Sequence, residues 1–309
     1  MKQTVEIKQL DSITILDSTS RIRKNLLDKW FLNGIDAIRF YMFAGRIASI
    51  PVLGLPLKKT LELYYRYLHT NSLIFPLKDI EEIISSATHL YVDPCPCRLV
   101  AGDEACDAPL FVCMRINNSA RIRKDQVGSK GLSRDDALKI MRNARKHGLV
   151  FSLESCIQPY QYNICSCCND CCIAMRMRYD YKLDIYNSGP YVPDMSADTC
   201  NACGICADAC PVHALSVTNG GPAANLKDCL GCGICSEVCP EESIRMVISK
   251  DRIRKDKEPG TLRMIVSLIY VYASMIPLVT LYRLVAGSIK QRSKQAMPNA
   301  NDVFNKDMQ

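Results

Sequence analysis

The chain has 309 residues, 48% of them apolar, which is enough for two domains with their own hydrophobic cores. The net charge is +7, but the basic residues are dispersed and no aromatic stacking platform accompanies them, so a nucleic-acid-binding role is excluded. Eighteen cysteines are far more than packing needs. Because the start of the chain lacks an apolar signal stretch and the cysteines are closely spaced, we predict metal ligation in the cytoplasm rather than disulfides.

Residues 1–84 are predicted to form a helical N-terminal region. A helical pattern runs through residues 34–70 with a break near Pro51 and Pro56, and residues 78–86 form another short helix. Ser133, with Asp136 three positions later, predicts the start of an amphipathic helix that ends before Gly148. We therefore expect a mainly helical upstream part, in which residues 85–187 form a cysteine-rich, metal-binding domain.

Ten cysteines precede residue 188, and all but Cys156 fall into two groups. The first group is Cys95, Cys97, Cys106 and Cys113, and the second is Cys165, Cys167, Cys168, Cys171 and Cys172. Cys165, Cys168 and Cys171 keep the spacing C-x-x-C-x-x-C that wraps an iron–sulfur cube, and Cys95 or Cys97 would supply the fourth ligand. Cys167 and Cys172 would remain to pair with Cys106 or Cys113 in a further site. Structural zinc and redox-active thiols are the alternatives.

Residues 188–195 carry Pro190 and Pro193 and are predicted to be a linker. The linker leads to a motif that occurs twice, C-x-x-C-G-I-C-x-x-x-C-P, starting at Cys200 and again at Cys229. Three cysteines at this spacing wrap one cube, and the fourth, which precedes a proline, reaches the cube of the other half. We expect one 4Fe-4S cluster on Cys200, Cys203, Cys206 and Cys239, and a second on Cys229, Cys232, Cys235 and Cys210.

Residues 196–248 therefore resemble the two-cluster ferredoxins of bacteria. The resemblance implies a small pseudo-symmetric domain whose fully ligated clusters carry single electrons. Gly204 and Gly233 would let the backbone pass close to each cube. Val217 and Val247 occupy matching places in the two halves, which predicts short strands that pair with each other. Two zinc sites are the alternative, but the third loop cysteine, the proline and the duplication argue against zinc.

The upstream block has a resemblance of its own. Residues 85–175 combine a C-x-C-R hook, a helix that ends in Gly-Leu-Val and a C-x-C-C-x-x-C-C run. This combination is similar to the N-terminal part of ferredoxin-fused proteins from anaerobes. No dinucleotide-binding or phosphate-loop motif is present in the sequence, and no cysteine triple has the spacing of radical S-adenosylmethionine enzymes.

The charges of the chain are distributed unevenly. Residues 196–248 contain six acidic and two basic residues, a net charge of −4, so the remainder of the chain is strongly basic. An acidic ferredoxin-like module suits docking to redox partner proteins by charge complementarity. A solvated surface without a partner explains the same charges equally well.

Residues 258–295 are predicted to form an apolar C-terminal helix, followed by a disordered tail at residues 296–309. Residues 264–282 carry no charge and would span about 28 Å as a helix. Ser267, Ser274 and Pro277 weaken the prediction of a membrane span. Docking in the plane of a membrane, docking to a partner subunit and packing in a domain core remain open for this segment.

The sequence as a whole predicts an α+β protein with a helical cysteine-rich part, a two-cluster ferredoxin domain and an apolar C-terminal helix. We expect an electron-transfer protein with two 4Fe-4S clusters and a third upstream cluster, or zinc, that passes electrons to a redox enzyme. A redox enzyme with a catalytic upstream metal site is the alternative, and a zinc-stabilised interaction module is a third hypothesis. The expected location is the cytoplasm, with the cytoplasmic face of a membrane as a docking surface for residues 264–282.

Overall fold

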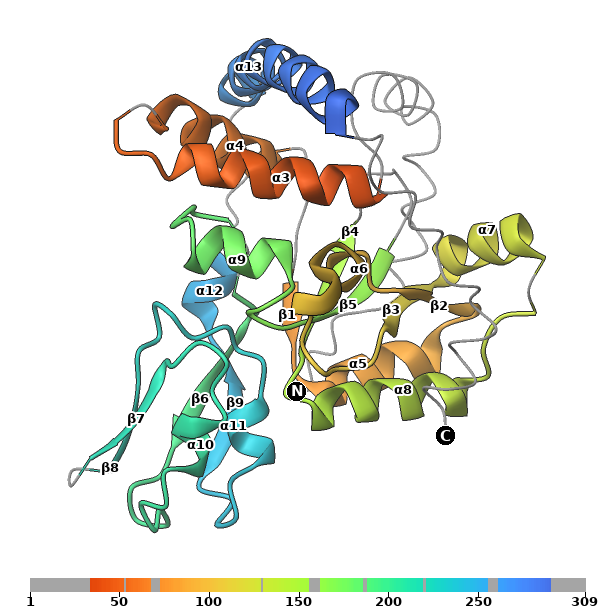
Figure 1. Cartoon of the computed structure of the whole chain (residues 1–309). Coiled ribbons are helices and arrows are strands. Elements are labelled where there is room, and N and C mark those ends of the chain that lie inside the picture. The colour runs from red at the N-terminus through yellow and green to blue at the C-terminus, as the bar shows by residue number, and fades with distance from the viewer. Residues whose placement is uncertain are drawn as a thin grey trace.

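Figure 1 shows the computed structural model of the chain, which describes residues 34–52, 54–67, 73–128, 130–155, 162–185, 188–218, 221–254 and 261–289. The predictions made for residues 1–33, for Cys156 and for the tail at 296–309 lie outside the described residues. The described chain forms three parts, which are a layer of helices, a sheet with its own helices and a small lobe of residues 191–248 (Figure 1).

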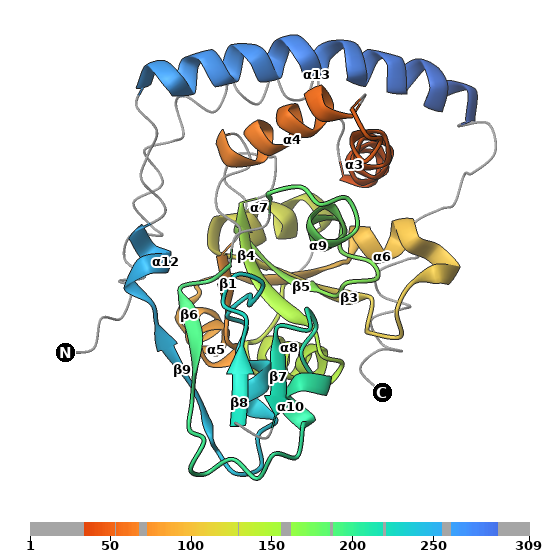
Figure 2. The same ribbon diagram turned by 90° about the vertical axis from the view of Figure 1, so that its left-hand side faces the viewer.

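The helical layer contains α3 (Gly34–Ala48) and α4 (Leu55–Tyr67), so the predicted break near Pro51 and Pro56 is confirmed. Helix α13 (Thr261–Ile289) lies across α4 on the outside of the molecule (Figure 2). Its inner side buries Val271, Met275 and Val279, whereas Ile269 and Leu284 are exposed.

For residues 264–282, which lie in helix α13, the sequence analysis left a membrane span as one of several possibilities. None of the helices in the described part of the chain combines the length and the apolar character that crossing a membrane requires. The docking role predicted for residues 264–282 stays a prediction.

The sheet has five antiparallel strands in the order β1-β4-β5-β3-β2. Their bounds are β1 (Leu73–Phe75), β2 (Leu90–Pro94), β3 (Phe111–Ile116), β4 (Val150–Ser155) and β5 (Tyr162–Cys167). Helices α5 (Leu77–Ser86) and α8 (Arg134–Lys146) bury their apolar sides on one face of the sheet, and α7 (Asn117–Val127) packs against β2 and β3. Helices α6 (Pro96–Ala101) and α9 (Ile173–Tyr179) lie between the other face and α3, and the 3-10 turn η2 (Gly102–Glu104) follows α6 (Figure 2).

Two of the helices on the sheet match the sequence predictions. Helix α5 covers the predicted segment 78–86. The Ser133 hydroxyl accepts a hydrogen bond of 3.1 Å from the Asp136 N–H, which confirms the predicted N-cap of α8, and Gly148 follows the helix with a φ of 72°. A side-chain acceptor at this position satisfies one of the N–H groups that the first helical turn leaves unpaired.

The sheet corrects the prediction of a mainly helical upstream part. Strands β3, β4 and β5 are six residues each, and helices cover both faces of the sheet. Strands β4 and β5 bury the polar residues Ser152, Glu154, Asn163 and Ser166, so neither a continuous apolar run nor a clear alternation of apolar and polar residues marks them in the sequence.

The lobe contains two small antiparallel sheets of two strands each. Strand β6 (Tyr191–Met195) pairs with β9 (Ile244–Ile248), and β7 (Leu215–Thr218) pairs with β8 (Gly221–Ala224). The segment predicted as a linker, residues 188–195, therefore contributes β6, and Pro193 is accommodated because every strand of a two-stranded sheet is an edge. Val217 and Val247 lie in strands as predicted, but in different sheets, so the predicted pairing between them is wrong. The short helices are α10 (Ile205–Asp208), α11 (Ile234–Glu237) and α12 (Lys250–Arg254).

Arg145, at the end of α8, joins the sheet to the lobe. Its guanidinium stacks on the Phe151 ring at 4.5 Å, donates to the Cys232 carbonyl at 3.1 Å and lies 3.2 Å from a carboxylate oxygen of Glu237. Burial lowers the pKa of Arg145 against the attraction of Glu237, and burial also raises the pKa of Glu237 against the attraction of Arg145. Forming such a pair is costly, but losing one partner leaves the other charge poorly solvated.

We therefore expect Arg145→Met to lower the free energy of unfolding by about 2–3 kcal/mol, because Glu237 and the Cys232 carbonyl lose their partner. Urea unfolding under anaerobic conditions measures the change. Arg142→Met is the matched control, since Arg142 is on the same helix and pairs with Glu81 on the exposed surface. Equal effects of the two substitutions would contradict the role given to Arg145.

Candidate metal centres

The eight cysteines of the repeated motif lie around two hollows in the lobe. The first hollow is lined by Cys200, Cys203, Cys206 and Cys239. The second is lined by Cys229, Cys232, Cys235 and Cys210. In each hollow, three cysteines come from one loop and the fourth comes from the other half of the lobe. We name these hollows site I and site II.

Local backbone geometry places these cysteines. Gly204 and Gly233 have φ angles of 78° and 82° and begin the short helices that carry the third loop cysteine of each site. The fourth cysteines accept hydrogen bonds from backbone N–H groups four residues later, from Ala214 to Cys210 at 3.2 Å and from Ser243 to Cys239 at 3.3 Å. N–H donors of this kind stabilise negative charge on sulfur and on a cluster that the sulfur binds.

The two sites differ in their surroundings. Exposed residues line site I, among them Asn201, Cys203 and Glu241. Site II faces the sheet, where Leu230 and Ile234 are buried with Ile74 and Met175. Burial raises the pKa of the Cys235 thiol to about 12.

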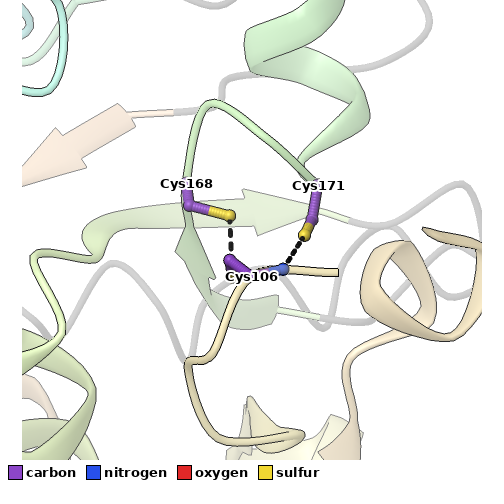
Figure 3. Close-up of side chains that lie close together, drawn as sticks. All are labelled: Cys106, Cys168 and Cys171. Atoms are coloured by element: carbon purple, nitrogen blue, oxygen red, sulfur yellow. Dashed lines mark hydrogen bonds between the residues drawn. The ribbon is translucent and has the colours of Figure 1, made fainter. Parts of the chain in front are cut away.

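Three upstream cysteines meet in a compact group, shown in Figure 3. The sulfur atoms of Cys106, Cys168 and Cys171 lie within 4.8 Å of one another, with 3.3 Å between those of Cys106 and Cys168. The Cys106 N–H donates to the Cys171 sulfur at 3.2 Å, and the Arg98 guanidinium donates to the Cys106 sulfur at 3.4 Å. Burial raises the pKa of Cys106, but the Ala108 N–H and Arg98 outweigh burial, so the pKa lies below its usual value. We name Cys106, Cys168 and Cys171 the three-cysteine group.

The structure does not assemble the ligand triple predicted from the spacing of the upstream run. Cys165 belongs to strand β5, which pairs with β3, and the Cys113 thiol on β3 raises the pKa of Cys165. Cys168 and Cys171 lie beyond the end of that strand. A C-x-x-C-x-x-C run wraps a cube only when all three cysteines are in one loop, and here the first of them is in the sheet.

The hook cysteines, Cys95 and Cys97, are placed with residues that the sequence prediction did not count as ligands. The Cys172 thiol and burial raise the pKa of Cys97, and the Cys167 thiol and burial raise the pKa of Cys172. The sequence signal that would have shown this is the adjacency in Cys167-Cys168 and Cys171-Cys172, because neighbouring side chains point in different directions and serve different sites.

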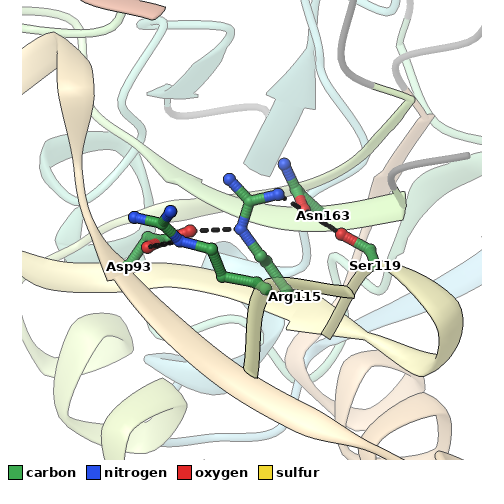
Figure 4. Close-up of polar contacts among 5 residues, drawn as sticks. Asp93, Arg115, Ser119 and Asn163 are labelled. Carbon is green, nitrogen blue, oxygen red and sulfur yellow. Dashed lines mark hydrogen bonds and ion pairs between the residues drawn. The ribbon is translucent and has the colours of Figure 1, made fainter. Parts of the chain in front are cut away.

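A polar network anchors the strand that leads into the hook (Figure 4). Asp93 is 6% exposed and accepts from the guanidinium groups of Arg115 and Arg123, the latter at 3.0 Å. Arg115 also donates to the Ser119 hydroxyl at 3.4 Å, which donates to Asn163 at 3.3 Å. The network ties β2, β3, α7 and β5 together, so it fixes the position from which Cys95 and Cys97 project.

Comparisons with known proteins match one region of the chain. A family model described as a 4Fe-4S dicluster domain matches residues 199–243. The chain is also 35% identical over 75 residues to the ferredoxin-type protein NapF of Escherichia coli K12, and equally to NapF of Escherichia coli O157:H7. These alignments cover 24% of this chain and 43% of NapF, so the chain spans less than half the length of these relatives. The chain contains a ferredoxin-type 4Fe-4S domain.

Gly204 and Gly233 occupy equivalent positions in the two halves of the domain, so substituting each of them in turn tests how site II packs against the sheet. Gly204→Ala and Gly233→Ala each force a side chain into left-handed backbone at a cost of about 1–2 kcal/mol. A Cβ at Gly204 would meet nothing within 4 Å, whereas a Cβ at Gly233 would lie 3.0 Å from the Pro76 side chain. We expect Gly233→Ala to lower the free energy of unfolding more than Gly204→Ala. An equal loss in urea unfolding would contradict the packing of Gly233 on Pro76.

Proposed function

We propose that the chain is an iron–sulfur electron-transfer protein in which sites I and II each hold one 4Fe-4S cluster. The observation that carries this proposal is the exchange of the fourth cysteine between the two hollows. Four thiolates complete the coordination of a cube, so neither cluster offers a position to a substrate. Clusters of this kind supply one-electron transfer, and the residues of the lobe set their exposure and their hydrogen bonds.

The different surroundings of the two sites support an order for electron transfer, in which site I exchanges electrons with a separate redox protein and site II exchanges them with the upstream part. Site I, with the exposed Cys203, is the one that a separate redox protein reaches. Site II is in contact with the upstream part, because the Asn169 amide donates to the Pro211 carbonyl, next to Cys210. Asn169 follows Cys168 directly, so the contact connects the loop of site II with the loop of the three-cysteine group.

We assign the further upstream cluster to the three-cysteine group. Its three sulfur atoms, the N–H donor of Cys106 and the buried Arg98 suit an anionic metal centre. This assignment replaces the predicted triple with Cys165. Zinc is the other metal for which three thiolates are suitable ligands.

A redox enzyme remains the second candidate, and one observation favours it. The three-cysteine group provides three thiolates from the described residues, one fewer than a cube requires. A centre with three cysteine ligands has a position for a substrate or for another ligand. The ferredoxin domain would then supply this centre with electrons.

None of the seventeen cysteines of the described chain forms a disulfide, and their short spacings are those of metal ligands in a reducing compartment. We therefore propose a cytoplasmic protein whose partners are redox proteins. The net charge of the ferredoxin domain favours a partner with a basic surface.

Cluster content is tested by two matched substitutions at equivalent positions of the repeat. Anaerobically purified protein should contain at least about eight iron atoms per chain, and Cys206→Ala and Cys235→Ala should each lose about four. Iron and acid-labile sulfide are counted, and EPR of the reduced protein identifies the remaining cluster. Fewer than eight iron atoms in the unaltered chain would overturn the proposal.

Docking at site I is tested by the salt dependence of electron transfer. Oxidation of the reduced protein by cationic hexaammineruthenium should slow several-fold as ionic strength rises, because screening weakens the attraction to the acidic lobe. Asp208→Asn with Glu242→Gln, both exposed residues of the lobe, should reduce the salt dependence. Asp135→Asn on α8 is the control. The same salt dependence with anionic ferricyanide would contradict an electrostatic docking face.

A further inference from the structure

The outer side of helix α13 is an exposed apolar face (Figure 2). The helix packs on α3 and α4 through Val271, Met275 and Val279, so the residues between these positions in the helical repeat point away from the protein. Ile269 and Leu284 are 64% and 69% exposed. Exposed apolar residues recur from residue 266 to residue 284, over about 27 Å of helix. They are Val266, Ile269, Tyr270, Ala273, Ile276, Pro277, Leu281 and Leu284.

The connection between α3 and α4 extends this apolar face. Its residues Ile50, Val52 and Leu55 are exposed. The Tyr270 hydroxyl donates to the Pro56 carbonyl at 3.4 Å, so the connection lies beside α13. Of the thirteen large apolar residues that are exposed in the described chain, nine belong to α13 or to this connection. A contiguous apolar surface of this kind marks an interaction site. We name the exposed residues of α13 and of the connection the outer face.

The outer face offers few polar groups to a partner. The hydroxyls of Ser274 and Thr280 donate to carbonyls four residues earlier on the same helix, at 2.6 and 2.8 Å. The Tyr270 hydroxyl is occupied by its contact with Pro56. Interfaces between proteins carry about one hydrogen bond per 100–200 Å² of buried area. Lipid suits this face better than a protein partner does, because lipid accepts apolar side chains without directional contacts.

The helical layer around the outer face is basic. Residues 34–67 and 261–289 contain seven basic and two acidic residues, a net charge of +5, and α13 has no acidic residue. Arg46, Lys59 and Arg283 are exposed, and none of them forms an ion pair with a described residue. A second copy of the chain would bring two positive layers together, which charge repulsion opposes. An anionic lipid surface has the complementary charge.

We propose that the outer face binds an anionic lipid bilayer. Helix α13 lies in the plane of the lipid interface, with its exposed apolar side chains inserted among the lipids and its inner side still packed on α4. Arg46, Lys59 and Arg283 supply positive charge to the lipid phosphates. The lobe is at the opposite end of the molecule from α13, so site I of the bound protein faces away from the lipid (Figures 1 and 2). The proposal does not rest on the clusters of the ferredoxin domain.

The first test is cosedimentation of the full-length, anaerobically purified protein with lipid vesicles. Vesicles of phosphatidylcholine mixed with phosphatidylglycerol should bind the protein at least about tenfold more tightly than vesicles of phosphatidylcholine alone, and added salt should weaken the binding. This comparison uses the unaltered chain, so it decides the question even where a variant does not fold. No binding to the mixed vesicles, or equal binding to both kinds, would overturn the proposal.

The second test removes the apolar contact. Ile269→Glu with Leu284→Glu should weaken binding to the mixed vesicles at least about tenfold, because charged side chains resist insertion among lipids. Leu226→Glu with Ile248→Glu is the matched control, since it makes the same change of charge at exposed apolar residues of the lobe and should bind like the unaltered chain. Iron content and EPR signals should be the same in all three proteins, which reports separately on folding and on the proposed function. An equal loss of binding in the two double variants would contradict the assignment to the outer face.

A second copy of the chain is the competing occupant, and sedimentation velocity without vesicles tests for it. We expect the unaltered chain and Ile269→Glu with Leu284→Glu to sediment alike as monomers. A dimer of the unaltered chain that this double variant separates would show that the outer face binds another copy, and the lipid proposal would then be wrong.

Discussion

The packing of site II on the upstream sheet is the contact on which the rest of the structure depends. Arg145 joins α8 to the α11 loop through Glu237 and the Cys232 carbonyl, and Asn169 joins the upstream cysteine loop to Pro211. Leu230 and Ile234 fill the space between these polar contacts. Site II packs on the sheet, whereas site I includes the exposed Cys203, so the two similar halves of the duplicated domain have different surroundings.

A buried arginine lies beside cysteine residues on each side of this contact. Arg145 lies beside the Cys232 loop of site II, and Arg98 lies between the hook and the three-cysteine group. A buried guanidinium requires a nearby negative charge. Where no carboxylate is near, a metal centre with thiolate ligands can supply that charge. The same positive charges favour the reduced, more negative state of a centre. The arginines thus connect the stability of the fold with the electron affinity of what it binds.

The repeat could be predicted from the sequence because its ligands are set by spacing within one loop and by a duplication. Helices α5 and α8 were predictable for a similar reason, since caps and apolar periodicity are local signals. The upstream ligand groups were not predictable, because they depend on strand pairing. Cys165 lies within β5, which pairs with β3, whereas Cys168 and Cys171 lie beyond the end of β5 and meet Cys106. Spacing alone suggested one loop, whereas strand β5 separates Cys165 from Cys168 and Cys171.

The relative electron affinity of sites I and II follows from a balance between burial and charge. Burial makes additional negative charge at site II less favourable, which by itself would direct electrons to the exposed site I. Arg145 opposes burial, because its positive charge is fixed beside the Cys232 loop by Glu237 and Phe151. Backbone N–H donors act on the fourth cysteine of each half at matching positions, so they do not separate the two sites. In the function that we propose, residues of the upstream part such as Arg145 therefore contribute to the difference between the two sites.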